Sequence, residues 1–479
     1  MFRIIVRKEG IIMSFLKRGS KRSDPNTMNI LVAGGGRVGE TLAQLLSAGS
    51  YNVTVIDTNG DMLEDLKSRY DMMAVQGNCA SMATLRDANV EKADLLIATT
   101  GSDELNLLTC TTARALNQNI HTIARIRNPE YIEQAYSMRD AFGLSLVFNP
   151  EQQAAIEIDR LLKYPAFLKR DSFAKGRVEI VELKIDAGSP LCNVSMIDMY
   201  KMVKCRVLVC TILRGDEVIT PTGQTVLLEG DRIFVTAPTN DLSTLLKNLG
   251  VVTHRIKQVF LAGGGRISYY LAQRLLKDRV DVRIVEKDLE RCRKLSELLP
   301  EAEIIHGDVA ELETLEEERF RSFDALVSLT DVDELNMIMS LYGTTCKLPS
   351  VITKLDNAEN TDVINSLPIG SVVCPRKLCC STVVRYVRAL QNQTGAATTI
   401  HAIADGRAEA VEFPVDSTTL HQEEALKDIK LKPHILIVCI SRGVETEIPN
   451  GMSSFKKGDH VVVVSTNETP ILQLNDIFA

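Results

Sequence analysis

The sequence predicts an α/β protein with two tandem Rossmann-like domains of doubly wound parallel sheet, each followed by a linking helix and a small β-rich α+β domain. Two observations support this prediction. A glycine-rich turn occurs at residues 34–39 and recurs at 263–268, each time after a short apolar run and before an amphipathic one. In both copies an acid, Asp57 or Glu286, stands 23 residues after the first glycine, at the end of a second apolar run.

The elements of the first copy return in the second copy in the same order. Short apolar runs typical of buried strands occupy matching places: 30–33 with 259–262, 53–56 with 282–285, and 93–98 with 323–328. Two polar motifs also return: Ser-Asp-Glu-Leu-Asn at 102–106 as Val-Asp-Glu-Leu-Asn at 332–336, and Ile-Ala-Arg-Ile-Arg-Asn at 123–128 as Ile-Thr-Lys-Leu-Asp-Asn at 352–357. Because strand-like and helix-like runs alternate throughout, we expect parallel βαβ sheets.

The pattern changes after each of these copies. Apolar residues at 154, 155, 158, 161 and 162 have helical spacing, and strand alternation follows at 178–185, with counterparts later in the chain. We therefore expect these domains: a basic, disordered extension over 1–27, a Rossmann-like domain over 28–148, a linking helix over 149–170, a β-rich domain over 171–250, a second Rossmann-like domain over 256–374, a second linking helix over 375–395 and a second β-rich domain over 396–479.

Composition narrows the class of protein. A chain of 479 residues is too long for one hydrophobic core, and its net charge of −7 argues against nucleic acid as a partner. No stretch reaches the roughly 18 consecutive apolar residues of a membrane-spanning helix, so we expect no transmembrane segment. The eleven cysteines include no Cys-x-x-Cys pair, which is typical of buried free thiols in a reducing cytosol.

The first glycine turn has the residues that a phosphate group requires. Gly34 allows a tight turn from strand to helix, Gly36 lets the backbone approach a diphosphate, and Gly39 lets the helix pack close to the sheet. The diphosphate would lie on the free N–H groups at the helix N-terminus, where Arg37 could add a positive charge. Asp57 is placed to accept both ribose hydroxyls of an adenosine, which favours NAD or ATP/ADP over NADP.

The second turn departs from this pattern. Ser268 replaces the third glycine, which predicts a looser turn, and Glu286 is a longer acid that still reaches a ribose. We therefore expect the second copy to bind a different nucleotide or to bind it with a different affinity.

No catalytic centre is evident in the sequence. Tyr200 and Lys204 form a Tyr-x-x-x-Lys pair, but it falls in the β-rich domain, away from any nicotinamide. Adjacent acids at 103–104 and at 333–334 diverge on a helix, so we interpret them as N-terminal acids that complement the helix dipole. The histidines are scattered, without metal-ligand spacing, at 121, 254, 306, 401, 421, 434 and 460. We expect no enzyme and no metal site, with an NAD-dependent oxidoreductase as the alternative.

The motifs together resemble a known family. The turn at 34–39, Asp57, Gly-Asn at 77–78 and the motifs at 102–106 and 123–131 closely resemble the RCK (KTN) domain, and the β-rich segments resemble its C-terminal companion. Two complete copies in one chain are similar to the tandem RCK subunits that regulate Trk-type potassium uptake. The resemblance covers residues 28–479.

The resemblance implies which residues contact the nucleotide. Lys354 stands where the first copy has Arg125, which keeps the charge but loses the bidentate fork. The implied cofactor-binding residues of the first copy are Gly34, Gly35, Gly36, Arg37, Val38, Gly39, Asp57, Asn78, Cys79, Thr100, Gly101 and Arg125. Those of the second copy are Gly263, Gly264, Gly265, Arg266, Ile267, Glu286, Asp308 and Lys354.

The resemblance also implies a regulatory function. The chain would be cytoplasmic and peripherally associated with the inner face of the membrane, as a homo-oligomeric ring beneath an integral membrane potassium transporter. It would bind NAD(H), with ATP or ADP as further ligands, and nucleotides with unequal affinity for two ring shapes would control ion uptake. The same ring beneath a potassium efflux channel is a second alternative.

Overall fold

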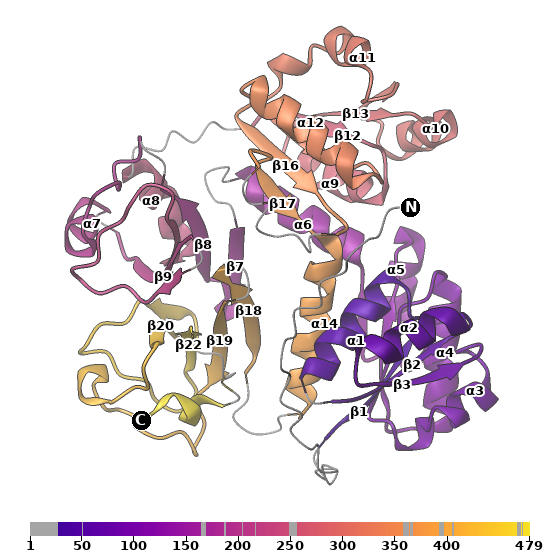
Figure 1. The fold of residues 1–479 in the computed structure, drawn as a ribbon, viewed down its shortest axis with the longest axis horizontal. Coiled ribbons are helices and arrows are strands. Elements are labelled where there is room, and N and C mark those ends of the chain that lie inside the picture. The colour runs from indigo at the N-terminus through magenta and orange to yellow at the C-terminus, as the bar shows by residue number, and fades with distance from the viewer. Residues whose placement is uncertain are drawn as a thin grey trace, which may run out of the picture.

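The computed structural model describes residues 27–479, apart from 50, 164–168, 186–187, 204, 216, 249–255, 358–363, 365–366, 392–396, 405–406, 467–470 and 472. This part of the chain forms two parallel sheets of six strands and two antiparallel sheets of five (Figure 1). The predicted fold class is confirmed. Of the extension expected over 1–27, all but residue 27 lies outside the described residues.

The first parallel sheet has the strand order β3-β2-β1-β4-β5-β6, the doubly wound order of dinucleotide-binding folds. Its strands are β1 (Asn29–Ala33), β2 (Asn52–Asp57), β3 (Met73–Gln76), β4 (Leu95–Ala98), β5 (His121–Arg125) and β6 (Leu146–Phe148). Its helices are α1 (Arg37–Ala48), α2 (Gly60–Arg69), α3 (Met82–Asp87), α4 (Asp103–Leu116) and α5 (Pro129–Ser137), with the 3-10 turn η1 (Val90–Lys92).

Local sequence explains where these elements begin. β4 is buried along its whole length because helices cover both faces of the parallel sheet. Three helices begin with a side-chain cap: Asn59, Ser102 and Asn128 each accept a hydrogen bond from an N–H group of the first turn. α1 differs, since Gly36 caps it without a side-chain hydrogen bond. The first N–H groups of α1 are therefore left for a ligand.

The second parallel sheet repeats this order as β14-β13-β12-β15-β16-β17. Its strands are β12 (Gln258–Ala262), β13 (Asp281–Glu286), β14 (Glu303–His306), β15 (Ala325–Ser328), β16 (Ser350–Lys354) and β17 (Ser371–Val373). Its helices are α9 (Arg266–Lys277), α10 (Leu289–Leu298), α11 (Leu312–Glu317) and α12 (Asp333–Thr345), with the 3-10 turn η4 (Phe320–Ser322).

The antiparallel sheets follow the parallel ones, in the orders β10-β9-β11-β8-β7 and β18-β19-β22-β20-β21. The first contains β7 (Lys169–Phe173), β8 (Val178–Lys184), β9 (Leu208–Arg214), β10 (Glu217–Ile219) and β11 (Arg232–Pro238), with α7 (Met196–Val203), α8 (Leu242–Asn248), η2 (Ala174–Gly176) and η3 (Thr239–Asp241). The second contains β18 (Thr399–Ile403), β19 (Ala408–Pro414), β20 (Ile435–Arg442), β21 (Glu445–Glu447) and β22 (His460–Ser465), with η6 (Leu426–Asp428) and η7 (Leu474–Ile477).

Both β-rich domains contain an Arg-Gly pair, at 214–215 and 442–443, and a Gly-Asp pair, at 230–231 and 458–459, and the arginine and the aspartate form an ion pair in each copy. The carboxylate of Asp231 accepts two hydrogen bonds of 2.8 Å from Arg214, and Asp459 accepts bonds of 2.9 and 2.8 Å from Arg442. The two sheets also pack against each other, because Phe173 of β7 and Val438 of β20 belong to one buried cluster.

Two linking helices, α6 (Pro150–Lys163) and α14 (Pro375–Gln391), exchange between the copies (Figure 1). The apolar face of α6, which includes Ile158, is buried in the core of the second parallel sheet. The apolar face of α14, which includes Val383, is buried in the core of the first sheet, against α1. Each copy therefore completes its core with a helix from the other, and the two Rossmann-like units form one packed body.

Candidate nucleotide-binding site

Both glycine turns adopt the backbone conformation expected of a phosphate-binding turn. Gly34 and Gly263 have φ angles of +99° and +105°, which favour glycine, and a Cβ at Gly34 would lie 2.9 Å from the backbone nitrogen of Thr100. A Cβ at Gly36 or Gly265 would meet nothing within 4 Å. These second glycines therefore border open space, where a diphosphate could approach the backbone.

The third position of the turn corrects one expectation from the sequence. A Cβ at Gly39 would lie 1.8 Å from the carbonyl oxygen of Gly34, whereas Ser268 occupies the same place and donates a hydrogen bond to the carbonyl oxygen of Gly263. The glycines that cap the two helices nevertheless have nearly equal backbone angles. Gly36 has φ −62° and ψ −177°, and Gly265 has φ −66° and ψ −174°. The prediction of a looser second turn is wrong, because the seryl hydroxyl binds the carbonyl group it faces.

The acid of each copy is positioned by the turn itself. Asp57 accepts hydrogen bonds from the backbone N–H groups of Gly35 at 2.8 Å and Asn59 at 2.9 Å. Glu286 accepts the corresponding bonds from Gly264 at 2.7 Å and Asp288 at 2.9 Å. The longer glutamate therefore makes the same two contacts, and each carboxylate keeps lone pairs that a ribose could use.

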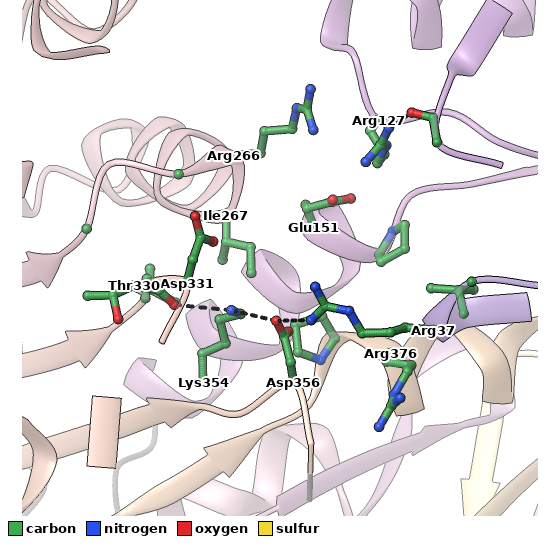
Figure 2. Close-up of a pocket in the computed structure, with 18 of the residues that line it drawn as sticks. Arg37, Arg127, Glu151, Arg266, Ile267, Thr330, Asp331, Lys354, Asp356 and Arg376 are labelled. Carbon is green, nitrogen blue, oxygen red and sulfur yellow. Dashed lines mark hydrogen bonds and ion pairs between the residues drawn. The ribbon is translucent and has the colours of Figure 1, made fainter. Parts of the chain in front are cut away.

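The two turns open into one cavity of about 1330 Å³ that both copies line (Figure 2). This volume exceeds the roughly 300–1,000 Å³ of a typical single-ligand site, so there is room for a ligand on each turn. Every predicted site residue lines the cavity except Gly35 and Gly39. The backbone N–H of Gly35 donates a hydrogen bond to Asp57. Gly39 lies against the carbonyl oxygen of Gly34 and the side chain of Thr99.

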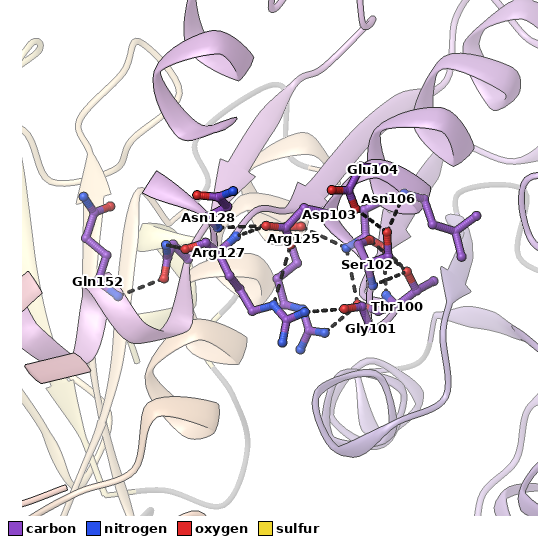
Figure 3. A network of polar contacts seen from close by, with 12 residues as sticks. Thr100, Gly101, Ser102, Asp103, Glu104, Asn106, Arg125, Arg127, Asn128 and Gln152 are labelled. Carbon is purple, nitrogen blue, oxygen red and sulfur yellow. Dashed lines mark hydrogen bonds and ion pairs between the residues drawn. The ribbon is translucent and has the colours of Figure 1, made fainter. Parts of the chain in front are cut away.

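The Ser-Asp-Glu-Leu-Asn motif holds the rim of the first site together (Figure 3). The buried amide of Asn106 accepts a hydrogen bond of 2.8 Å from the backbone of Thr100 and donates one of 2.9 Å to the carbonyl oxygen of Arg125. Asp103 accepts bonds of 2.9 and 2.8 Å from the backbone N–H groups of Arg127 and Asn128. Asp103 begins α4 as expected, but its carboxylate joins two loops in addition to complementing the helix dipole.

Two guanidinium groups lie on this rim. Arg125 donates to the carbonyl oxygen of Thr100, and Arg127 donates to that of Gly101 (Figure 3). Burial lowers the pKa of Arg125, and the neighbouring charge of Arg127 lowers it further. The buried Nε atoms of both residues have no hydrogen-bond partner in the described part of the chain. A bound anion would relieve the repulsion between these two cations.

The second site has the same hydrogen bonds around an asparagine, but the charges near them differ. Asn336 accepts a bond of 2.9 Å from the backbone of Thr330 and donates one of 3.1 Å to the carbonyl oxygen of Lys354. Lys354 donates to the carbonyl oxygen of Thr330 at 3.2 Å, as Arg125 does to Thr100. At the place of Arg127, however, the second copy has Asp356.

Other predicted residues have structural roles. Cys79 is 5% exposed, with its Sγ atom 3.3 Å from the hydroxyl of Thr109, and burial raises the pKa of its thiol. It therefore borders the site as a neutral group. Tyr200 lies on α7 in the first antiparallel sheet region, where its hydroxyl accepts a bond of 3.3 Å from the backbone of Val209, and Lys204 lies outside the described residues.

Sequence reasoning missed several charged residues that line the cavity, among them Arg127, Glu151, Asp356 and Arg376. The first and third stand two residues beyond Arg125 and Lys354, so a position-by-position comparison of the repeated motif could have found them. Glu151 and Arg376 follow the prolines that open the linking helices. Only the helix exchange places these two in the cavity, and nothing in the local sequence indicates it.

No helix in the described ranges is both long and apolar enough to cross a bilayer.

Comparisons with protein families and with solved structures point to the same family. Residues 30–150 and 259–375 match the TrkA-N domain, and residues 180–250 match the TrkA-C domain. Among solved structures, the GsuK RCK domain superposes with a TM-score of 0.60 at 18% identity, covering 93% of this chain and 94% of its own. The GsuK channel bound to NAD gives a TM-score of 0.59 at 18% identity, covering 93% and 78%. These likenesses show the fold.

Sequence relatives cover nearly the whole chain. The Trk system potassium uptake protein TrkA of Halomonas elongata is 30% identical over 456 residues, which is 94% of this chain and 98% of that protein. The homologue from Archaeoglobus fulgidus is 32% identical over 436 residues, covering 91% and 97%. TrkA of Vibrio alginolyticus is 29% identical over 457 residues, covering 94% and 98%. The chain therefore belongs to the TrkA family of Trk-system potassium uptake proteins.

Proposed function

We propose that this chain is the peripheral regulatory subunit of a Trk-type potassium transporter, which binds adenosine nucleotides and controls ion uptake by a change of shape. One observation carries the proposal: two phosphate-binding turns face a single cavity between two interlocked Rossmann-like units. The relatives that cover nearly the whole chain are named as potassium uptake proteins. The protein would lie in the cytoplasm, against the inner face of the membrane.

The chemistry of the cavity supports a nucleotide as the ligand. The first turns of α1 and α9 have no side-chain cap, so their N–H groups are available to a diphosphate. Asp57 and Glu286 lie at the ends of β2 and β13, where the acid of a dinucleotide-binding fold accepts hydrogen bonds from a ribose. NAD(H) fits these requirements, and ATP or ADP fits them as well. The GsuK channel, which shares the fold, is known in a structure bound to NAD.

The linking helices could couple nucleotide binding to a change in the conformation of the chain. α6 and α14 each begin at the cavity and end buried in the core of the opposite copy. A nucleotide that favours one spacing of the two copies would therefore move both helices, and with them the antiparallel sheets that follow. A ligand can shift the equilibrium only by its difference in affinity for the two states.

Exposed apolar side chains support a homo-oligomer. Leu108 on α4 is 55% exposed, and its counterpart Ile338 on α12 is 61% exposed. Val332, at the start of α12, is 48% exposed. Matching apolar positions on the two copies can serve the same contact twice, which is what closing a ring from tandem subunits requires.

The proposal is tested by nucleotide titration and by transport. The purified full chain, titrated calorimetrically with NAD, NADH, ATP and ADP, should bind up to one nucleotide per Rossmann-like copy. Potassium uptake by the partner transporter, reconstituted in vesicles with the chain, should change when nucleotide is added. If nucleotide binds but uptake is the same with and without the chain, the regulatory function is wrong.

Two alternatives have their own tests. A soluble NAD-dependent oxidoreductase would turn over NADH with a candidate substrate, and Asp57→Ala would abolish that turnover. A regulator of potassium efflux would co-purify from membranes with a channel instead of an uptake transporter.

A further inference from the structure

The two nucleotide sites differ most at one corner of the cavity. In the first copy, Arg127 donates to the carbonyl oxygen of Gly101, and its Nε atom lies 3.6 Å from the carboxylate of Asp103. In the second copy the corresponding positions are Asp356 and Asp331, and both line the cavity. One guanidinium group in the first site is therefore replaced by two carboxylates in the second.

Asp356 also pairs with two cations at this corner of the cavity, while Arg266, Lys287, Arg291 and Lys294 line other parts of the second site. Its Oδ2 atom lies 3.2 Å from the Nζ atom of Lys354 and 3.2 Å from the Nη1 atom of Arg37, which crosses from the first copy (Figure 2). Lys354 is the counterpart of Arg125, and the side chain of Arg125 forms no ion pair with a carboxylate among the described residues. Figure 2 draws Arg266 and Arg127 toward one side of the cavity, and the group around Asp356 toward the other.

The exchanged helices increase the difference. α6 packs against α9, and Asn149 just before it donates a bond of 3.1 Å to Tyr270, so Glu151 enters beside the second turn. α14 packs against α1, and the thiol of Cys380 lies 3.8 Å from the carbonyl oxygen of Val38, so Arg376 enters beside the first turn. In the described part of the chain, the buried Oε2 atom of Glu151 and the buried Nε atom of Arg376 have no hydrogen-bond partner.

From this charge pattern we infer that the two sites select different nucleotides, and that Asp356 with Asp331 sets the difference. The first site takes a nucleoside di- or triphosphate, because a terminal phosphate carries a second negative charge that Arg125 and Arg127, on the rim of that site, can balance. The second site takes a dinucleotide such as NAD, whose two bridging phosphates carry one charge each and have no terminal group. This assignment rests on the proposed nucleotide-sensing function and adds the ligand class of each site.

The selection follows from Coulomb interactions in a partly closed cavity. A terminal phosphate on the second turn would face the carboxylates of Asp331 and Asp356 and would compete with the latter for Lys354. A dinucleotide leaves less charge at that corner and continues toward the facing copy. The residues therefore weaken the binding of the more anionic ligand more than that of the less anionic one, which is discrimination by repulsion.

The test is calorimetry on the full chain with ATP and with NAD as separate ligands. We expect the wild type to bind one ATP per chain, and to bind one further NAD when ATP is saturating. Asp356→Arg, which restores the residue of the first copy, should raise ATP binding to two per chain, with at least a tenfold gain at the second site. Glu286→Ala in the same background should remove that second ATP and so identify the site.

Three matched variants serve as controls. Asp356→Asn removes the charge and keeps the shape, and should give a smaller gain in ATP affinity. Asp331→Gly restores the glycine of the first copy and should act in the same direction, which guards against misfolding of the arginine variant. Arg127→Asp should weaken ATP at the first site about tenfold and affect NAD less.

Several outcomes would overturn the inference. Two equal ATP sites in the wild type would do so, and so would equal gains for ATP and NAD in Asp356→Arg and Asp331→Gly. Those results would leave the proposed function intact, because nucleotide would still bind. Failure of every nucleotide to bind the wild type would reject both the inference and the proposed function.

Discussion

The two glycine turns have the same shape but stand in different electrostatic surroundings. Their capping glycines differ by only a few degrees, and both acids accept the same pair of backbone hydrogen bonds. Around them, however, Arg127 of the first copy corresponds to Asp356 of the second. Backbone geometry has survived duplication because several contacts require it at once, whereas a single charged side chain on a cavity wall can change without harm to the fold.

The largest expected effect concerns the core that the copies share. Ile158→Ala in α6 should lower the free energy of unfolding by about 2–4 kcal/mol, because it leaves a cavity in the core of the second sheet. Hydrogen exchange should show the loss of protection in β12 and β13 of the second copy. Val383→Ala in α14 is the matched variant and should affect β1 and β2. If Ile158→Ala reduces protection only in the first copy and Val383→Ala only in the second, the helix exchange does not hold the copies together.

The third position of the turn is the next comparison. Gly39→Ala should cost about 1–3 kcal/mol, because its Cβ would lie 1.8 Å from the carbonyl oxygen of Gly34. Ser268→Gly should cost about 1 kcal/mol, since it removes one hydrogen bond and adds freedom to the unfolded chain. Urea denaturation measures both. Equal costs would mean that the two helices approach their sheets in different ways.

The acids allow a direct comparison of binding. Asp57→Ala should weaken nucleotide binding at the first site about tenfold, because the ribose loses a charged acceptor and the turn loses two anchoring bonds. Glu286→Ala should have a similar effect at the second site, since its two contacts are the same. Calorimetry with separate site stoichiometries provides the measurement. A loss at both sites from either variant would show that the sites are coupled.

The smallest expected effect lies in the antiparallel sheets. Burial raises the pKa of Glu412, but the imidazole of His460, 3.2 Å from its Oε1 atom, and a hydrogen bond from the backbone N–H of Ala174 hold that pKa below the ordinary value of 4.5. Because the folded pKa is the lower one, the contribution to stability is present above pH 4.5 and is lost as pH falls through the folded pKa. Its size should be below about 1 kcal/mol.

The corresponding pair in the first copy, Glu182 with Arg232, supplies the comparison. Glu412→Gln should flatten the loss of stability between neutral pH and about pH 4, as followed by urea denaturation. An unchanged pH profile in this variant would mean that the pair with His460 does not stabilise the folded chain.

Much of the fold could be predicted because it repeats local rules. Short apolar runs, glycine turns and the residues that cap helices, such as Asn59 and Ser102, act over a few neighbours in sequence. Because the chain is duplicated, each element is predicted twice, once in each copy. The strand order of both parallel sheets follows from this pattern, since right-handed βαβ units allow few alternatives.

The site was predicted less completely. The turn residues and the acids carry motif signals, but the role of Asn106 and Asp103 as a brace between two loops depends on contacts across the sheet. Arg127 and Asp356 have no signal of their own within a single copy, because a charged residue after a strand is usually solvated. Their meaning comes from what lies opposite them in the cavity.

Sequence alone was sufficient for the duplicated Rossmann-like architecture, the phosphate turns and the acids, because these are set by backbone conformation and by short-range spacing. It did not indicate that α6 and α14 change places, that the two turns share one cavity, or that Glu151 and Arg376 stand beside the opposite turns. Those features depend on which apolar face covers which sheet. That choice is made by packing between segments more than a hundred residues apart, which no local pattern encodes.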